Sequence, residues 1–149
     1  MIDNLQDFNE LLAEGFNTEE YEGFIYLTYC IPEDLYYLGK KNFRHNVKKK
    51  LGKKELASIP VTRGRRPTSK MTVKDSGWVN YYGSHKKIPI WLKQYGPENI
   101  TRGIVKLCKD KKMLTYWENK YLYSMNVLEP GSKFINDNVQ GRFFKSDFI

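Results

Sequence analysis

The spacing of apolar residues along the chain predicts alternating helices and strands. Five apolar residues recur at helical intervals between residues 4 and 16, namely Leu5, Phe8, Leu11, Leu12 and Phe16. This spacing predicts an amphipathic helix that Asp3 or Asn4 would cap and that Gly15 and Asn17 would end. Residues 23–29 and 35–39 are rich in aromatic and β-branched types, which predicts two strands. A turn at residues 31–34 would join them as a hairpin.

Three further elements follow in the second half of the chain. Residues 86–95 predict a helix with Ile88, Leu92 and Tyr95 on one side, and residues 100–108 alternate as a third strand would. The clearest helix is residues 110–128, whose apolar stripe holds Met113, Leu114, Trp117, Tyr121, Met125 and Leu128. The expected fold class is α/β, more narrowly α+β, with a small three-stranded antiparallel sheet flanked by helices.

Residues 44–77 interrupt this order. They contain Gly52, Pro60, Gly64, Pro67 and Gly77 within a basic run. We predict a long, mobile insertion that becomes ordered on binding. The expected organisation is therefore an acidic helical segment at residues 1–22, followed by a domain at residues 23–149 that carries this insertion.

The charge is divided sharply along the chain. The net charge is +8, yet residues 1–22 hold seven acids and no Lys or Arg, so the remainder carries +15. Residues 44–76 alone contain eleven Lys or Arg and two acids. This density favours a polyanionic partner, and nucleic acid is the usual one. A solvated charge run that only keeps the protein soluble is the alternative.

Other features exclude several classes of protein. No apolar stretch approaches the roughly 18 residues of a membrane span. The early acidic residues are unlike a secretory signal. Cys30 and Cys108 lack the spacing of a zinc site or a disulfide framework, although they could still pair. These features predict a cytoplasmic protein, and the lysine-rich, low-alanine composition is compatible with a phage.

The predicted hairpin carries the most specific motif. Phe24-Ile25-Tyr26 lies on its first strand, and Tyr37-Leu38-Gly39 lies on its second, with the two tyrosines eleven residues apart. Together with the elements that follow, this resembles the GIY-YIG nuclease family over roughly residues 23–138. Both tripeptides depart conservatively from the family signature and keep their tyrosines. We expect Gly39 to allow a close approach of the backbone to phosphate or a sharp turn.

The resemblance implies a metal-dependent DNA endonuclease. Glu118 matches the glutamate that holds a single divalent cation, expected to be Mg²⁺ or Mn²⁺. Tyr26 matches the general base or water-orienting residue, and Tyr37 matches the tyrosine near the attacked phosphate. A phenol needs a nearby cation to lower its pKa before it can take a proton at neutral pH. Taken alone, Glu118 would more often be an exposed helix acid paired with a nearby lysine.

The remaining site positions are less sharply matched. The family's arginine corresponds best to Arg44, with Lys41 second and Lys40 and Lys48 as competitors. Tyr82 and His85 are candidates for a further site residue, and Asn136, or alternatively Asp137, matches the closing asparagine. The expected substrate is double-stranded DNA, and the residues expected to contact it are Lys40, Lys48, Lys49, Arg63, Arg65 and Arg66.

Two other functions are compatible with the same residues. A non-catalytic nucleic-acid-binding module would bind DNA without turnover, and an RNA- or ribosome-associated protein would need only the basic insertion. The oligomeric state, monomer or homodimer, stays open. The acidic segment could fold back over the basic cleft, or its apolar residues could complete the core.

Overall fold

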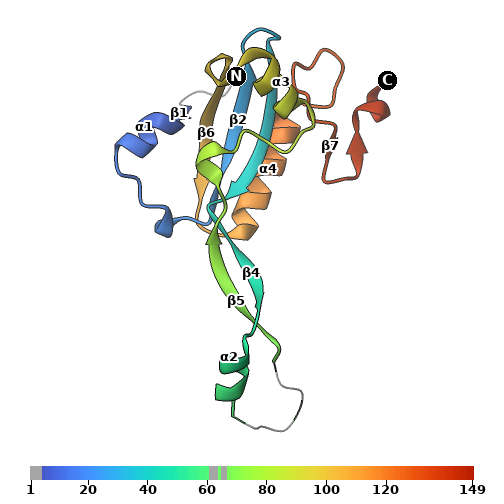
Figure 1. Cartoon of the computed structure of the whole chain (residues 1–149). Helices are drawn as coiled ribbons and strands as arrows, with labels where there is room; N and C mark the ends of the chain where they lie inside the picture. Colours follow the sequence, from blue (N-terminus) through green and yellow to red (C-terminus); the bar gives the residue numbers. More distant parts are fainter. Residues whose placement is uncertain (1–4, 61–63, 65–66) are drawn as a thin grey trace.

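A computed structural model describes residues 5–60, 64 and 67–149. Its central sheet contains β2 (Gly23–Cys30), β3 (Leu35–Asn42) and β6 (Ile100–Cys108). A two-residue strand, β1 (Gln6–Asp7), pairs with the outer edge of β6, and the order is β1-β6-β2-β3 with every pair antiparallel (Figure 1). The predicted α+β class with an antiparallel sheet is confirmed, and the sheet gains β1 as a short fourth strand.

One face of the sheet packs on α4 (Lys111–Ser124). Ile25, Leu27 and Leu38 lie buried against Leu114 and Leu122 of this helix. The helix begins at Asp110, whose carboxylate accepts a hydrogen bond from the Met113 backbone N–H at 2.7 Å. It ends four residues before the predicted boundary at residue 128, because the chain turns at residues 125–128.

The opposite face of the sheet is covered by aromatic side chains from several segments. Phe8 and Leu11 of α1 (Phe8–Ala13) are buried with Phe24, Phe43 and Trp78. Phe8 and Leu11 therefore complete the core, as the simpler of the two expectations has it, whereas Leu5 is 42% exposed. The helix is shorter than predicted because residues 6–7 pair with β6. The proposed caps Asp3 and Asn4 and the Leu12 side chain lie outside the described parts.

The same face is closed at its other end by α3 (Lys87–Tyr95), which confirms the predicted helix. Ile88 and Trp91 of α3 are buried with Cys30, Ile100 and Ile135. Cys30 and Cys108 are both buried and both free thiols, so they do not form a disulfide.

Most of residues 44–77 forms regular structure, which the sequence pattern did not predict, and the expected mobility of this segment stays a prediction. β4 (Arg44–Lys50) and β5 (Ser69–Asp75) pair antiparallel in a two-stranded ribbon, with α2 (Lys53–Ser58) near its tip. We call residues 44–75 the arm, which projects away from the sheet (Figure 1). The strands were not predicted because lysines occupy positions at which an alternating strand would carry apolar residues. Hydrogen bonds between the two backbones can hold such a ribbon together without an apolar face.

Short elements complete the chain. They are η1 (Thr18–Glu20), η2 (Trp78–Asn80), η3 (Pro97–Asn99), β7 (Asn138–Val139), β8 (Phe143–Phe144) and η4 (Lys145–Phe148). A register shift places Ile25 opposite Lys106 but Tyr26 opposite Ile104, so one extra residue bulges from β6. None of the helices within the described residues has the length and apolar character needed to cross a membrane.

Candidate active site

The two signature tyrosines lie on one face of the β2–β3 hairpin. Tyr26 is opposite Gly39 and Thr28 is opposite Tyr37, so these four residues share a face because directly opposed residues project to the same side. The Tyr26 and Tyr37 rings are 6.2 Å apart between centroids. The hairpin spacing in the sequence is thus sufficient to bring the two phenols together.

Gly39 provides the space that Tyr26 occupies. A Cβ atom at this position would lie 2.6 Å from the Tyr26 hydroxyl oxygen and 2.8 Å from Cζ. The Tyr26 ring therefore crosses over β3 at a position without a side chain. The sequence suggested a role for Gly39 in the backbone's approach to phosphate, whereas the structure gives the glycine a steric role beneath the tyrosine.

The outer edge of β3 holds the rest of the site in register. Tyr36 pairs with Phe134 across this edge as an isolated parallel bridge. Two residues further, the buried Asn136 side chain accepts from the Leu38 N–H at 3.2 Å and donates to the Leu38 carbonyl at 2.8 Å. Another two residues on, the Lys40 backbone hydrogen-bonds to the Glu118 carboxylate. Asn136 and Glu118 thus contact the backbone of Leu38 and Lys40, which are alternate residues along the outer edge of β3.

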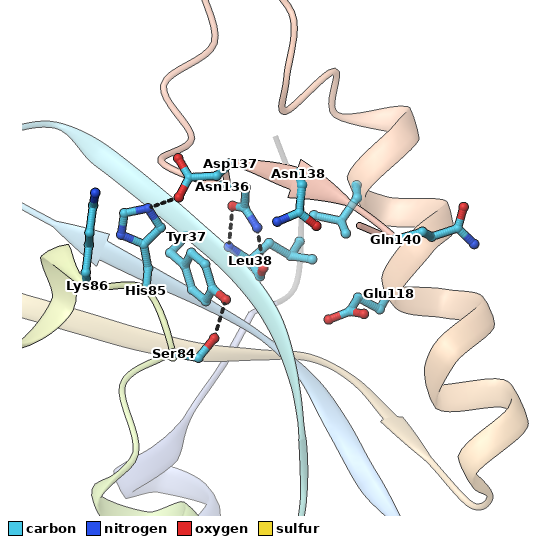
Figure 2. A pocket seen from close by; sticks show the side chains of 11 residues that line it. Tyr37, Leu38, Ser84, His85, Lys86, Glu118, Asn136, Asp137, Asn138 and Gln140 are labelled. Atoms are coloured by element: carbon cyan, nitrogen blue, oxygen red, sulfur yellow. Dashed lines mark hydrogen bonds and ion pairs between the residues drawn. The ribbon is translucent and has the colours of Figure 1, made fainter. Parts of the chain in front are cut away.

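Glu118 projects from α4 into a polar cavity of about 530 Å³. Tyr37, His85 and Asn136 line the same cavity, and Figure 2 shows Glu118 facing them from across it. Burial raises the pKa of the Glu118 carboxyl above its ordinary value, and the positive charge of Lys40 opposes that rise. The structure therefore assembles Tyr37, Glu118, His85 and Asn136 from four separate segments.

Tyr26 lies behind this cavity and is 1% exposed. Burial raises its pKa strongly, and the neighbouring Tyr37, Tyr81 and Glu118 side chains raise it further. To act as a general base, Tyr26 would need a nearby cation that lowers its pKa, whereas burial and all of these neighbouring side chains raise it. At neutral pH Tyr26 is consequently a neutral phenol that can donate or accept a hydrogen bond.

Tyr37 is placed more openly than Tyr26. Its hydroxyl lies 2.8 Å from the Ser84 hydroxyl, and its ring packs beside His85 (Figure 2). Burial is the main cause that raises the pKa of Tyr37. Sequence reasoning overlooked Ser84, because a lone serine in a loop carries no spacing signal.

Both ring nitrogens of His85 lie close to a neighbouring residue. Nδ1 accepts a hydrogen bond from the Lys87 backbone N–H at 3.0 Å. Nε2 lies 2.7 Å from a carboxylate oxygen of Asp137, although this contact is not a well-aligned hydrogen bond. Since both nitrogens face partners, the geometry suits a positioning role for the imidazole better than proton transfer.

Two candidates from the sequence lie away from the cavity. The Arg44 guanidinium donates to the backbone carbonyls of Thr18 at 3.1 Å and Tyr21 at 2.9 Å. It thereby ties the root of the arm to the N-terminal segment. The Tyr82 ring stacks under Arg102, with the guanidinium carbon 4.0 Å from its centroid. The adjacent Tyr81, which no sequence motif singles out, contacts Tyr26 instead, with ring centroids 5.8 Å apart.

Lysines provide positive charge near the site. The Lys41 ammonium lies 4.0 Å from the Tyr81 ring centroid. The Lys40 ammonium donates to the Thr115 hydroxyl at 3.0 Å. No arginine lines the cavity in the part of the chain that the structure describes.

The other expected DNA contacts lie on the arm. Lys48 and Lys49 lie on β4, where both are exposed. Arg63, Arg65 and Arg66 lie outside the described residues. The arm and the cavity are connected directly, because β3 continues into β4 through Asn42 and the buried Phe43.

The donor groups in the cavity fit a hard divalent cation. No group of three or more His, Cys, Asp or Glu side chains that could hold a metal occurs among the described residues. Two carboxylates line the cavity, Glu118 and Asp137, of which Asp137 contacts His85, and the neutral side chains of Asn138 and Gln140 line it as well. Mg²⁺ typically uses one or two carboxylates and keeps water or phosphate oxygens as its other ligands.

The raised pKa of Glu118 gives a prediction that does not depend on activity. A carboxyl whose pKa is raised on folding favours the folded state most when it is protonated, and that advantage is lost as the pH rises through the folded-state pKa. Each unit of elevation costs about 1.4 kcal/mol of stability at neutral pH. Glu118→Gln should therefore raise the melting temperature near pH 7, with a smaller gain in acid, below the ordinary pKa of a glutamate.

Differential scanning fluorimetry with and without Mg²⁺ would measure both effects. If Glu118 is the metal ligand, Mg²⁺ should stabilise the wild-type chain and leave Glu118→Gln unchanged, because the amide lacks the negative charge that would hold the ion. The exposed Glu129 provides the matched Glu→Gln control and should resemble wild type throughout. Equal stabilisation of Glu118→Gln by Mg²⁺ would exclude Glu118 as the metal ligand.

Comparison with known proteins agrees with this geometry. The family model described as "Putative endonuclease segE, GIY-YIG domain" matches residues 8–139. No curated protein and no solved structure matches the chain. The matched region includes the tyrosine hairpin, Glu118 and Asn136, and it spans well over half of the chain. The protein therefore belongs to the GIY-YIG endonuclease family and is a phosphodiester hydrolase.

Proposed function

We propose that this endonuclease hydrolyses duplex DNA with the help of one divalent cation. The observation that carries the proposal is the convergence of Tyr37, Glu118 and Asn136 on one polar cavity, with Tyr26 directly behind Tyr37. Phosphodiester hydrolysis requires an oriented water, relief of negative charge at the phosphate and stabilisation of the leaving oxygen. The cavity brings together groups suited to each of these tasks.

Glu118 is the residue that would hold the cation. When bound, Mg²⁺ or Mn²⁺ supplies positive charge against the negative charge that develops on the phosphate and the leaving 3′ oxygen. The half-buried carboxylate strengthens this interaction, because burial removes competing water. The Lys40 backbone hydrogen bond keeps the carboxylate at the edge of β3, facing the cavity.

The tyrosines orient the reactants as neutral phenols. The Tyr37 hydroxyl lines the cavity and donates a hydrogen bond to a phosphate oxygen, while the buried Tyr26 packs behind Tyr37 and holds its ring in place. The raised pKa of both groups keeps their protons in place at neutral pH. The proton lost by the water passes to solvent in the open cavity, and the 3′ oxygen takes up a proton from solvent.

Lys41 supplies the cationic side chain near the phosphate in this proposal. Its contact with Tyr81 places its ammonium beside a tyrosine that itself touches Tyr26. Arg44 is less suitable because its guanidinium is engaged with two backbone carbonyls. Lysine acts as a point charge and lacks the bidentate geometry of arginine.

The direct test is cleavage of plasmid and linear DNA in Mg²⁺, in Mn²⁺ and in EDTA. We expect nicked or linear products in either metal and none in EDTA, because the catalytic charge is supplied by the ion. Gel electrophoresis of time points would give the rate and would separate nicking from double-strand cleavage. Full activity in EDTA would contradict metal dependence, and degradation of RNA alone would contradict the substrate.

A further inference from the structure

The two faces of the arm differ in chemistry. Directly opposed residues of an antiparallel pair share a face, so the ladder from Arg44↔Asp75 to Lys50↔Ser69 defines both faces. We call the first the front face, which carries Asn46, Lys48, Met71 and Val73 between the arm's root and tip. The second is the back face, which carries His45, Val47, Lys49, Lys70, Thr72 and Lys74.

The front face leaves two apolar side chains in water. Met71 is 62% exposed and Val73 is 67% exposed, and they are two residues apart on β5. Asn46 lies opposite Val73 and Lys48 lies opposite Met71, so amide and ammonium groups border the apolar pair. On a projecting two-stranded ribbon, such a mixed patch is suited to contact with a partner.

The back face carries lysines at three of its six positions, and some of its side chains are engaged within the arm. The Lys70 ammonium forms an ion pair with Glu55 of α2 at 3.1 Å. The Thr72 hydroxyl donates to the Val47 carbonyl at 3.2 Å, which ties the two strands together on this side. The front face is therefore the side of the ribbon that presents exposed apolar groups.

We propose that the front face of the arm enters the major groove of duplex DNA and contacts thymine methyl groups through Met71 and Val73. This inference rests on the proposed function. A two-stranded ribbon fits the major groove, which is about 12 Å wide, and thymine methyls are displayed only there. The arm's described residues include eight Lys or Arg and two acids, which complements the phosphate backbone on either side.

The fold fixes where such a contact lies relative to the cavity. β3 carries Gly39 and Lys40 at the site and continues through Phe43 into β4. Phe43 is buried between Phe24 and Trp78, and the Ser76 backbone N–H donates to the Phe43 carbonyl at 3.0 Å. From Gly39 to Val47 an extended chain spans roughly 25 Å, so the contacted bases would lie up to about seven base pairs from the cleaved bond.

Replacement of thymine by uracil tests this contact, because it removes only the methyl group. Full-length Glu118→Gln protein prevents cleavage during the measurement, and fluorescence anisotropy gives the affinity for matched thymine and uracil duplexes at fixed salt. Burial of one methyl group is worth about fourfold in affinity. We expect the thymine duplex to bind at least about fourfold more tightly by this measure.

Substitution of the front face should reduce that preference. M71T/V73T in the same background keeps β-forming residues, so the ribbon should persist, which far-UV circular dichroism would check. We expect the ratio of thymine-duplex to uracil-duplex affinity to fall toward one, because the substitutions remove apolar surface from the front face and leave one methyl group at each position. The matched back-face variant H45T/K49T should bind both duplexes more weakly while keeping the thymine preference, because phosphate contacts do not distinguish the bases.

A thymine-to-uracil affinity ratio of one in the parent protein would overturn the proposal, as would a ratio that survives M71T/V73T. A dimer that dissociates on M71T/V73T, without any uracil effect, would assign the front face to self-association instead. The two proposals fail separately. Cleavage in Mg²⁺ without a thymine preference would contradict only the proposed contact between the arm and thymine. A thymine preference without cleavage under any metal would contradict only the proposed nuclease mechanism.

Discussion

Glu118→Gln should lower the single-turnover rate of DNA cleavage at least about a thousandfold, since a catalytic metal supplies several kcal/mol of charge stabilisation. The amide keeps the size and the hydrogen-bonding capacity of the side chain but removes the charge that would hold the cation. DNA affinity should remain close to wild type, because the basic arm lies apart from Glu118. Nicking of supercoiled plasmid at saturating enzyme, with anisotropy for binding, would measure both quantities.

The Glu129→Gln variant is the control, because it removes an exposed carboxylate outside the cavity. It should cleave at the wild-type rate. Equal cleavage by Glu118→Gln would show that another group holds the metal. If the wild-type chain bound DNA with steep salt dependence and cleaved nothing under any metal, the protein would be a non-catalytic binding module.

Gly39→Ala should reduce the cleavage rate about a hundredfold while the protein still folds, because displacement of a catalytic group by about 1 Å has an effect of this size. The added Cβ would lie 2.6 Å from the Tyr26 hydroxyl oxygen, so the ring must move. Overpacking of this kind costs about 1–3 kcal/mol of stability. Plasmid nicking would give the rate and thermal unfolding would give the stability.

Two comparison variants separate the steric effect from a general effect of alanine. Gly52 has an ordinary backbone conformation, and a Cβ added there would meet nothing within 4 Å, so Gly52→Ala should match wild type. Addition of Tyr26→Phe to Gly39→Ala removes the closest atom, which should recover part of the stability but none of the rate. A wild-type rate for Gly39→Ala would show that the position of Tyr26 does not limit the reaction.

Sequence spacing was most informative within single elements and hairpins. Tyr26 and Tyr37 could be paired in advance because side chains alternate along a strand and the short turn fixes the register. The helix that carries Glu118 was recognised from its apolar stripe. The strands of the arm were not predicted because they are mostly exposed and lysine-rich, so they lack the hydropathy signal on which strand prediction depends.

The sequence by itself determined the hairpin, its two tyrosines and the helix that bears Glu118, since each depends on residues close together in the chain. Only the tertiary structure decided that Arg44 anchors the arm, that Tyr81 rather than Tyr82 meets Tyr26, and that Asn136 caps the outer edge of β3. These contacts join residues separated by many positions. Packing of the sheet, α4 and the chain's end sets them, and no local periodicity encodes that packing.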